Sequence, residues 1–253
     1  EIDLFSCDFE LLILVGDEEY EPDEKDDPDD FPEMAGYTFD NFIVGNSNKF
    51  AHAAAIAVAE NPGKNYNPLF IYGNSGLGKT HLLWAIGHSI REHFPEKKIS
   101  YIKGDDFTNE LIKAIKEGKT EDFRNKHRHA DLLLFDDIQF IAKNMQNFQE
   151  EFFNTFNALT NADKQIVITS DVAPKDLPGI EERLISRFEG GMLQEIESPG
   201  YETRLAILKK KSEGMVPEVS NSTLKFIASN IKSHVRAMEG ALGKVNIFAN
   251  RDL

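Results

Sequence analysis

The segment that most constrains how this chain folds is GNSGLGKT at residues 73–80. It matches the pattern G-x-x-x-x-G-K-[ST], follows a short apolar run at Leu69–Tyr72 and precedes a helical pattern at Thr80–His93. In this context the glycines let the backbone wrap closely around phosphate oxygens, and the backbone N–H groups and the helix N-terminus form an anion site. We expect Lys79 to neutralise the β- and γ-phosphates of a nucleotide and the Thr80 hydroxyl to bind Mg²⁺. A glycine-rich turn without a ligand is the alternative that this pattern disfavours.

An acidic pair at the end of a second apolar run supplies the other half of such a site. The residues of Leu132–Phe135 are all apolar, and Asp136 and Asp137 follow them. A core strand cannot bury two adjacent carboxylates, so both should emerge at the carboxyl edge of the sheet, where nucleotide sites of this kind place an acidic residue. We expect Asp136 to hold hydrated Mg²⁺ and Asp137 to polarise the attacking water. Helix capping by one of them is the plainer alternative, and the two motifs together indicate a P-loop NTPase.

Short apolar runs alternate with helical patterns, which indicates an α/β fold with a parallel sheet. The predicted strands are Leu69–Tyr72, Ile99–Ile102, Leu132–Phe135 and Ile166–Thr169. The predicted helices among them are Ala51–Glu60, Thr80–His93, Asp105–Lys116, Thr120–His127 and Gln149–Leu159. After Pro199 the strand signals stop, and the expected elements are helices at Tyr201–Lys211, Ser220–Ile231 and Val235–Ala249. We therefore expect a three-layer nucleotide-binding core over 37–198 and a small helical lid over 199–253.

Polar residues beyond the fourth predicted strand extend the site. That strand runs into Ser170 and Asp171, and a polar side chain at its tip should lie near the γ-phosphate. Arg183 and Arg187 follow, four residues apart and therefore on one face of a helix. Such an arginine can act in trans on a phosphate that another subunit binds. Ordinary surface salt bridges are the alternative.

The negative charge of the chain is concentrated near its N-terminal end. The net charge is −15, but residues 1–36 hold 15 acidic side chains and one base, so the remaining residues are close to neutral. The acidity therefore does not exclude nucleic acid as a partner of the folded part. Residues 1–20 contain apolar stretches and are interpreted as the remnant of an N-terminal interaction domain. Residues 21–36 are interpreted as an acidic flexible linker, because they have too few aliphatic side chains to offset the entropy of ordering.

The cysteine count and the hydropathy pattern exclude other classes of protein. Cys7 is the single cysteine, which excludes an internal disulfide framework and a multi-cysteine zinc site. No apolar run reaches the roughly 18 residues of a membrane span. The run at Leu11–Val15 is short and lacks the preceding bases of a secretory signal. We therefore expect a cytoplasmic protein.

Seven stretches of the chain share a pattern with one family of proteins. They are YTFDNFIVG (37–45), NPLFIYGNSGLGKTHLL (67–83), LLLFDDIQF (132–140), QEEFFNTFNAL (149–159), IVITSD (166–171), EERLISRF (181–188) and SHVRAMEGAL (233–242). Together they resemble the AAA+ domain of the bacterial replication initiator DnaA, over some 217 of the 253 residues. The resemblance implies a P-loop AAA+ core with a helical lid, ATP or ADP and Mg²⁺ as ligands, and a weak ATPase activity that serves as a switch.

The resemblance also implies roles for named positions. The adenine pocket would be lined by Phe42, Ile43, Val44 and Gly45. The phosphates would be held by Gly73, Ser75, Gly76, Leu77, Gly78, Lys79, Thr80 and His81. Arg187 matches the arginine finger that reaches the ATP of a neighbouring protomer, and Arg183 its companion at that interface. Asp171 matches a sensor of the γ-phosphate and Arg236 a lid arginine that contacts ATP in cis, so the expected catalytic set is Asp136, Asp137, Asp171, Arg187 and Arg236.

Members of this family bind single-stranded origin DNA through helices after the second core strand, which correspond to Asp105–His129. The bases of this region are Lys113, Lys116, Lys119, Arg124, Lys126 and Arg128, with His127 and His129. Ile112 would be an apolar contact with a base or sugar, and Lys113 one of the basic contacts. Family members often carry a base just before QEEFF, where this chain has MQNF and Lys143 is the nearest base. A solvated pair of charged helices is the alternative.

The function that the resemblance implies is ATP-dependent initiation of chromosomal DNA replication. The ATP-bound form would self-associate into helical oligomers at the origin and open the duplex, and slow hydrolysis would reset it. The replicative helicase and acidic phospholipids are further implied partners. Family members continue into a duplex-reading helix-turn-helix domain, whereas this chain stops at Leu253, so we expect no sequence-specific duplex binding from it. The alternatives are an AAA+ helicase loader or an initiator-regulating paralogue and, more distantly, a metabolic P-loop kinase.

Overall fold

The computed structural model describes residues 31, 36–141 and 146–249, so the predicted N-terminal remnant and most of the predicted linker lie outside the described residues. Within them, five strands form one parallel sheet in the order β2-β3-β4-β1-β5. The strands are β1 (Leu69–Tyr72), β2 (Ile99–Lys103), β3 (Leu132–Asp136), β4 (Gln165–Ser170) and β5 (Met192–Glu195).

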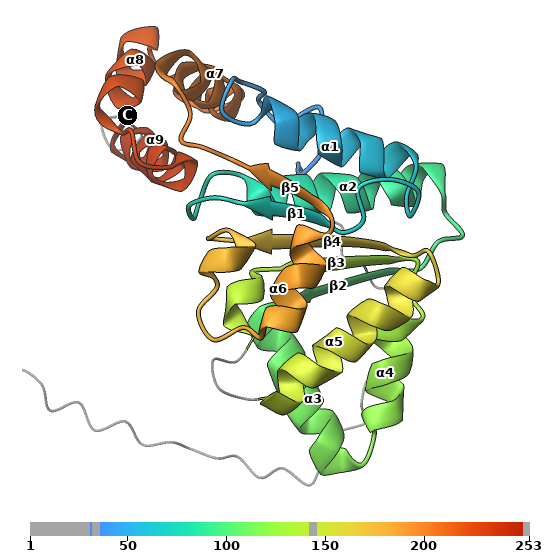
Figure 1. Ribbon diagram of the computed structural model, residues 1–253. Helices are drawn as coiled ribbons and strands as arrows, with labels where there is room; N and C mark the ends of the chain where they lie inside the picture. Colours follow the sequence, from blue (N-terminus) through green and yellow to red (C-terminus); the bar gives the residue numbers. More distant parts are fainter. Residues whose placement is uncertain (1–30, 32–35, 142–145, 250–253) are drawn as a thin grey trace, which may run out of the picture.

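Helices cover both faces of this sheet (Figure 1). The face that is uppermost in Figure 1 carries α1 (Lys49–Glu60) and α2 (Lys79–His93). The opposite face carries α3 (Gly104–Glu117), α4 (Thr120–Arg128), α5 (Gln146–Asn161) and α6 (Glu182–Glu189). Two short 3₁₀ turns, η1 (Ile138–Phe140) and η2 (Pro174–Asp176), follow β3 and β4.

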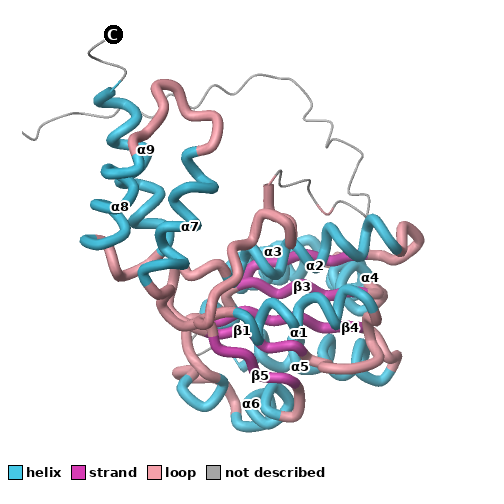
Figure 2. Tube along the Cα trace, turned by 90° about the horizontal axis from the view of Figure 1, so that it is seen from above, coloured by secondary structure: helices cyan, strands magenta, loops and turns pink. Residues whose placement is uncertain are grey.

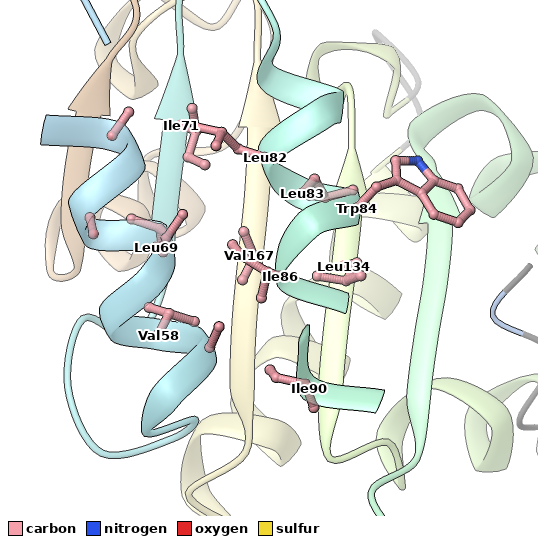
Figure 3. Packing of buried hydrophobic residues seen from close by; sticks show 14 of the residues in the cluster. Val58, Leu69, Ile71, Leu82, Leu83, Trp84, Ile86, Ile90, Leu134 and Val167 are labelled. Carbon is pink, nitrogen blue, oxygen red and sulfur yellow. The ribbon is translucent and has the colours of Figure 1, made fainter. Parts of the chain in front are cut away.

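The apolar strands feed two cores, because successive side chains of a strand point to opposite faces of the sheet. In β3, Leu132 and Leu134 join the core under α1 and α2, whereas Leu133 and Phe135 join the core under α3, α5 and α6. Figure 3 shows the first of these cores, with Leu134 facing the side chains of α2. A strand buried on both faces is apolar throughout, which is why the sequence of β3 has no alternation.

The last three described helices form a separate lid with its own core. They are α7 (Tyr201–Ser212), α8 (Asn221–Asn230) and α9 (Val235–Ala249), and Figure 2 shows them grouped beside one end of the sheet. Leu208, Leu224 and Met238 are central to their shared core. Arg204 is buried among them and donates hydrogen bonds to the carbonyl oxygens of Ala228 (2.8 Å) and Pro199 (2.7 Å). Among the described residues, no helix combines the length and the apolar character needed to cross a membrane.

The predicted α/β fold with a parallel sheet and a helical lid is confirmed, and most predicted elements differ from the observed ones by a few residues at each end. Strand β5 has no counterpart among the predicted strands. Its four residues, MLQE, lie at the edge of the sheet and are half-buried or exposed, so they carry no apolar run. The division at residue 198/199 stays a prediction.

Phe31 is buried against α2, although it belongs to the predicted flexible linker. Its side chain is 1% exposed, its ring stacks on Trp84 with centroids 4.5 Å apart, and the Arg91 guanidinium lies 4.9 Å from its centre. A glycine at position 87 permits this contact, because a Cβ there would lie 2.4 Å from Phe31 Cζ. An aromatic side chain therefore fixes the end of the acidic segment to the core.

Replacing Phe31 by alanine should destabilise the protein and expose Trp84, the single tryptophan of the chain. Burial of a phenylalanine side chain contributes about 1.5–3 kcal/mol, and its removal lets water reach the indole. We expect a red shift of tryptophan emission and a lower midpoint of urea unfolding. The control is Phe226→Ala, since that side chain is 68% exposed. Native emission and an unchanged midpoint for Phe31→Ala would contradict the anchoring role.

Candidate nucleotide site

A cavity of about 320 Å³ lies between the carboxyl edge of the sheet and the lid. Its size suits a small-molecule ligand. The phosphate-loop segment contributes Ser75, Gly76, Leu77, Gly78, Lys79, Thr80 and His81. The strand ends contribute Tyr101, Lys103, Asp136, Asp137 and Asp171, and the lid contributes Ile207, Lys210, Lys211, Val235, Arg236 and Glu239. The structure thus brings together residues from distant parts of the chain, as the two sequence motifs predicted.

The loop between β1 and α2 has a backbone conformation that requires glycine. Gly78, which immediately precedes α2, has φ +102°, a value that side-chain-bearing residues rarely adopt. Gly73 has φ +145°, and a Cβ on it would lie 2.2 Å from the carbonyl oxygen of Ile196. The loop therefore holds the N-terminus of α2 towards the cavity, where its N–H groups and dipole favour an anion.

Lys79 is buried at the base of this loop and is already hydrogen-bonded. Its side chain is 5% exposed, and Nζ donates to the carbonyl oxygens of Gly73 (2.7 Å) and Asn74 (3.1 Å). The ammonium also forms an ion pair with Asp171, whose Oδ1 lies 2.8 Å away. The structure thus places the predicted sensor residue in direct contact with the predicted phosphate-binding lysine.

Asp136 and Thr80 form the part of the cavity that suits a cation. Thr80 Oγ1 donates to both carboxylate oxygens of Asp136, at 3.1 and 3.3 Å. Burial raises the pKa of Asp136 and the neighbouring charge of Asp137 adds to this, while hydrogen bonds from Thr169 and Thr80 act in the opposite direction. A buried carboxylate whose charged form is disfavoured is stabilised by a cation.

This donor set fits Mg²⁺, which usually takes one or two carboxylates from the protein and completes its octahedron with phosphate oxygens and water. The described residues contain no group of three or more His, Cys, Asp or Glu side chains that could hold a metal by themselves. A metal here would therefore depend on the nucleotide for its remaining ligands.

Thr169 is a site residue that the motifs did not single out. It is fully buried on β4, its hydroxyl donates to Asp136, and it accepts a hydrogen bond from the backbone N–H of Asp137 at 2.9 Å. Asp137 itself has φ +56° and ψ +58°, the left-handed conformation, which turns the chain away from the sheet directly after β3. The sequence did contain a signal for this role, because Thr169 is a polar residue within an apolar strand, and a buried hydroxyl needs a hydrogen-bond partner.

The four residues predicted for the adenine pocket separate into two groups. Phe42 and Ile43 line the cavity, whereas Val44 is 47% exposed and does not line it. Gly45 lies behind the wall and against the lid, because a Cβ on it would be 2.2 Å from Thr203 Oγ1. The predicted segment is therefore at the cavity, but only half of it forms the cavity wall.

Asn48 holds this turn in place and was not predicted. Its Oδ1 accepts from the N–H of Gly45 at 2.7 Å, and its Nδ2 donates to the carbonyl oxygen of Ile43 at 3.0 Å. The side chain is 6% exposed and lines the cavity. Although Asn48 directly precedes α1, its side chain makes no capping hydrogen bond to that helix. Nearby, the ring Nε2 of His81 lies 2.8 Å from the Thr38 carbonyl oxygen and donates to it.

The three predicted arginines occupy two different places. Arg236, on α9, lines the cavity, and its Nη1 lies 3.4 Å from Ser75 Oγ. Arg183 and Arg187, on α6, do not line it. Arg183 bonds to Glu181 and lies over the Phe153 ring at 4.5 Å. Arg187 is exposed and has no side-chain partner among the described residues, so its position is compatible with a contact in trans.

The basic residues of α3 and α4 are mostly engaged within the fold. Arg124 and Arg128 both bind Glu151 on α5, and Lys126 binds Glu110 at 3.2 Å. Lys119 lies 3.6 Å from Glu117. On α3, Lys113 and Lys116 are exposed and have no side-chain partner among the described residues.

His127 anchors α4 and is not available to a ligand. It is fully buried, and burial lowers the pKa of His127, which favours the neutral ring. Because a carboxylate accepts, Nε2 donates to Glu110 (3.3 Å) and Nδ1 accepts from the Ser100 hydroxyl (2.9 Å). The predicted apolar contact Ile112 is half-buried against the core, whereas Ile115, which was not predicted, is 57% exposed. Lys143 lies outside the described residues.

A phosphate loop and a lid arginine that face one cavity from two subdomains define the nucleotide-binding module of AAA+ proteins. The more distant alternative, a metabolic kinase, gives no reason for that lid. The family model for the bacterial DnaA ATPase domain matches residues 34–195, and the chain belongs to this family.

Replication initiators are among the proteins to which this chain is similar. It is 56% identical over 214 residues to the chromosomal replication initiator protein DnaA of Thermoanaerobacter sp. strain X514, which covers 85% of this chain and 48% of that protein. It therefore spans about half the length of the curated relatives it matches. Domain III of the Thermotoga maritima DnaA superposes with a TM-score of 0.83 at 42% identity, covering 87% of this chain and 92% of the other. A replication initiator DnaA bound to AMPPCP and single-stranded DNA has a TM-score of 0.76 at 40% identity and covers 83% and 64%.

Replacing Asn48 by alanine should weaken ATP and ADP binding equally, because Asn48 holds the turn that was predicted to contact adenine, which both nucleotides share. Loss of its two hydrogen bonds at about 1 kcal/mol each predicts a roughly 10- to 30-fold higher Kd. Isothermal titration of both nucleotides measures this. Asn46→Ala is the matched control, since Asn46 is exposed in the same turn. A selective loss of ATP, with ADP unaffected, would contradict the assignment.

Proposed function

We propose that this chain is the ATP-responsive core of a chromosomal replication initiator. Its ATP-bound form self-associates on origin DNA and opens the duplex, and slow hydrolysis of ATP ends the active state. The observation that carries the proposal is Arg187, which is exposed, lies outside the cavity of its own chain and has no partner among the described residues. An exposed arginine without a partner among the described residues, placed outside the cavity of its own chain, supports a contact with the nucleotide that a second copy binds.

In the proposed reaction, the loop N–H groups and Lys79 bind the β- and γ-phosphates, and Arg236 contacts them from the lid. Thr80 and Asp136 would hold Mg²⁺, which would supply positive charge next to the phosphates. Asp137 orients the attacking water towards the γ-phosphorus. The contact between Lys79 and Asp171 supports a sensing role for Asp171, because a γ-phosphate at Lys79 comes within its reach.

The proposed assembly follows from the positions of Arg187 and of the nucleotide cavity, which would meet in the contact between two copies. Arg187 is on α6, and the cavity that it would complete lies between the sheet and the lid. Such a contact joins two different surfaces of the same chain, and repeated head-to-tail contacts build an open helix or a filament unless the rotation closes a ring. This supports self-association into helical oligomers.

Replacing Arg187 by alanine should leave ATP affinity within about twofold and abolish ATP-dependent assembly, because the side chain contacts the nucleotide of the neighbour. An Arg finger contributes a factor of about 10³ or more to phosphoryl transfer, so hydrolysis in the assembled state should be lost as well. Light scattering with ATP and with ADP measures assembly. Lys225→Ala, on the exposed face of α8, is the control. Normal assembly of Arg187→Ala would refute the assignment.

We propose single-stranded DNA as the nucleic-acid partner of the core, on the exposed surface of α3. Lys113 and Lys116 are the unpaired lysines there, and Ile115 is an exposed apolar side chain between them in sequence. The proposal keeps Lys113 in its predicted role and adds Ile115 beside Ile112 as the apolar contact. The relative bound to AMPPCP and single-stranded DNA supports this class of partner.

Lys113→Ala should weaken binding of single-stranded DNA by the ATP-bound protein, whereas Lys126→Ala should not, because Lys126 is paired with Glu110. Removing one phosphate-binding base from the interface makes the slope of log K against log salt shallower by about 0.7. Fluorescence anisotropy with a labelled oligonucleotide, over a series of salt concentrations, measures both quantities. Equal effects of the two substitutions would place the binding surface elsewhere.

Other parts of the proposal rest on the family alone. Family membership favours an initiator over a helicase loader or a regulatory paralogue. The proposal also includes a cytoplasmic location and contacts with the replicative helicase and acidic phospholipids. It further includes the interpretation of residues 1–20 as a remnant of an interaction domain. We expect the core to bind DNA weakly, in an ATP-dependent and salt-sensitive manner.

A further inference from the structure

Gln139 connects two acidic residues of the cavity without lining the cavity itself. It lies in the 3₁₀ turn that follows β3. Its Nε2 donates to Asp137 Oδ1 at 3.1 Å, and its Oε1 accepts from the backbone N–H of Asp171 at 3.3 Å. Asp137 and Asp171 both line the cavity, and Gln139 does not. The amide therefore spans the tips of two adjacent strands, β3 and β4.

Both ends of this bridge are held by further contacts. On one side, the backbone N–H of Asp137 is fixed by Thr169 at 2.9 Å, so the freedom left to this residue is in its side chain. On the other side, the carboxylate of Asp171 is paired with Lys79 at 2.8 Å. An unbroken series of contacts thus runs from Lys79 through Asp171 and Gln139 to the carboxylate of Asp137.

A glutamine suits this position better than other polar residues. It donates to Asp137 and accepts from Asp171 at the same time, which a neutral amide can do and a carboxylate or an ammonium cannot. A lysine would neutralise the carboxylate that has to polarise water, and a glutamate would repel it. With Oδ1 engaged by the amide, Oδ2 of Asp137 is left to accept a hydrogen bond from the water.

We propose that Gln139 is a positioning residue for ATP hydrolysis. It fixes the carboxylate of Asp137 and links the orientation of that carboxylate to the contact between Asp171 and Lys79. This role rests on the proposed hydrolysis, since Asp137 is assigned there to the attacking water. A displacement of a catalytic group by about 1 Å costs up to about 10²-fold in rate. Gln139 therefore affects the chemical step and leaves nucleotide binding alone.

The test compares Gln139→Ala and Gln139→Glu with the unsubstituted chain, in the presence of ATP, Mg²⁺ and single-stranded DNA. Single-turnover hydrolysis, the Kd for ATP, assembly with the analogue AMPPCP and the thermal midpoint are measured. We expect hydrolysis to fall about 10- to 100-fold in both variants. The Kd should stay within about threefold, and assembly with the analogue and the thermal midpoint should be unchanged. Gln139→Asn should recover part of the rate, because its shorter amide can still donate to Asp137.

Gln139→Glu is the decisive variant, because it keeps the length of the side chain and the acceptor for Asp171 but removes the donor. Asn154→Ala, an exposed amide on α5, is the control and should hydrolyse ATP normally. Full activity of Gln139→Glu would overturn the positioning role. Parallel losses of ATP affinity and thermal stability in Gln139→Ala would overturn it too, since they indicate a structural role. An unsubstituted chain that binds ATP without any hydrolysis would instead refute the proposed function, and the role of Gln139 with it.

Discussion

The parallel register between β1, β3 and β4 is the constraint on which the nucleotide site depends. Phe135 of β3 pairs with Ile168 of β4, and Ser170 of β4 pairs with Tyr72 of β1. Because parallel strands end at the same edge, this register brings the phosphate loop after β1, the acidic pair after β3 and Asp171 after β4 into one place. Shifting one strand by one residue would turn its core side chains to the other face and separate these groups. The apolar runs of the strands therefore maintain the geometry of the polar site.

The sequence predicted the fold well where a pattern reports directly on burial, and less well where a contact depends on tertiary packing. Apolar strands and the phosphate loop were found because their composition follows from being covered on both faces or from approaching a phosphate. The edge strand Met192–Glu195 has neither property and carries no such signal. Asn48, Gln139 and Thr169 were not predicted as site residues, since each is a common polar residue whose role is defined by partners on other elements. No spacing rule connects Thr169 with Asp136 before the two strands are placed side by side.

The basic residues of α3 and α4 show that a binding surface, too, cannot be predicted from the sequence without knowledge of the tertiary contacts. In sequence, Arg124, Arg128 and Lys126 are as good candidates for a phosphate contact as Lys113. In the structure, both arginines share the carboxylate of Glu151, which is 7% exposed, and hold α4 against α5. These pairs matter for stability, because removing one partner would leave a charge with little access to water. A count of bases along a helix therefore overestimates the charge that is available to DNA.

The close approach of Gly45 to Thr203 has a consequence for how the lid can move. The turn at Gly45 packs against the first helix of the lid, and a Cβ on Gly45 would lie 2.2 Å from Thr203 Oγ1, so a larger residue would not fit between them. Val235 at the start of α9 also donates its N–H to the carbonyl oxygen of Gly76 in the phosphate loop, at 3.0 Å. The lid is thus attached to the core on two sides of the cavity, by the packing of Thr203 on Gly45 and by the hydrogen bond of Val235 to Gly76. A rotation of the lid away from the sheet would therefore have to break both contacts together, which ties the shape of the cavity to the position of the lid.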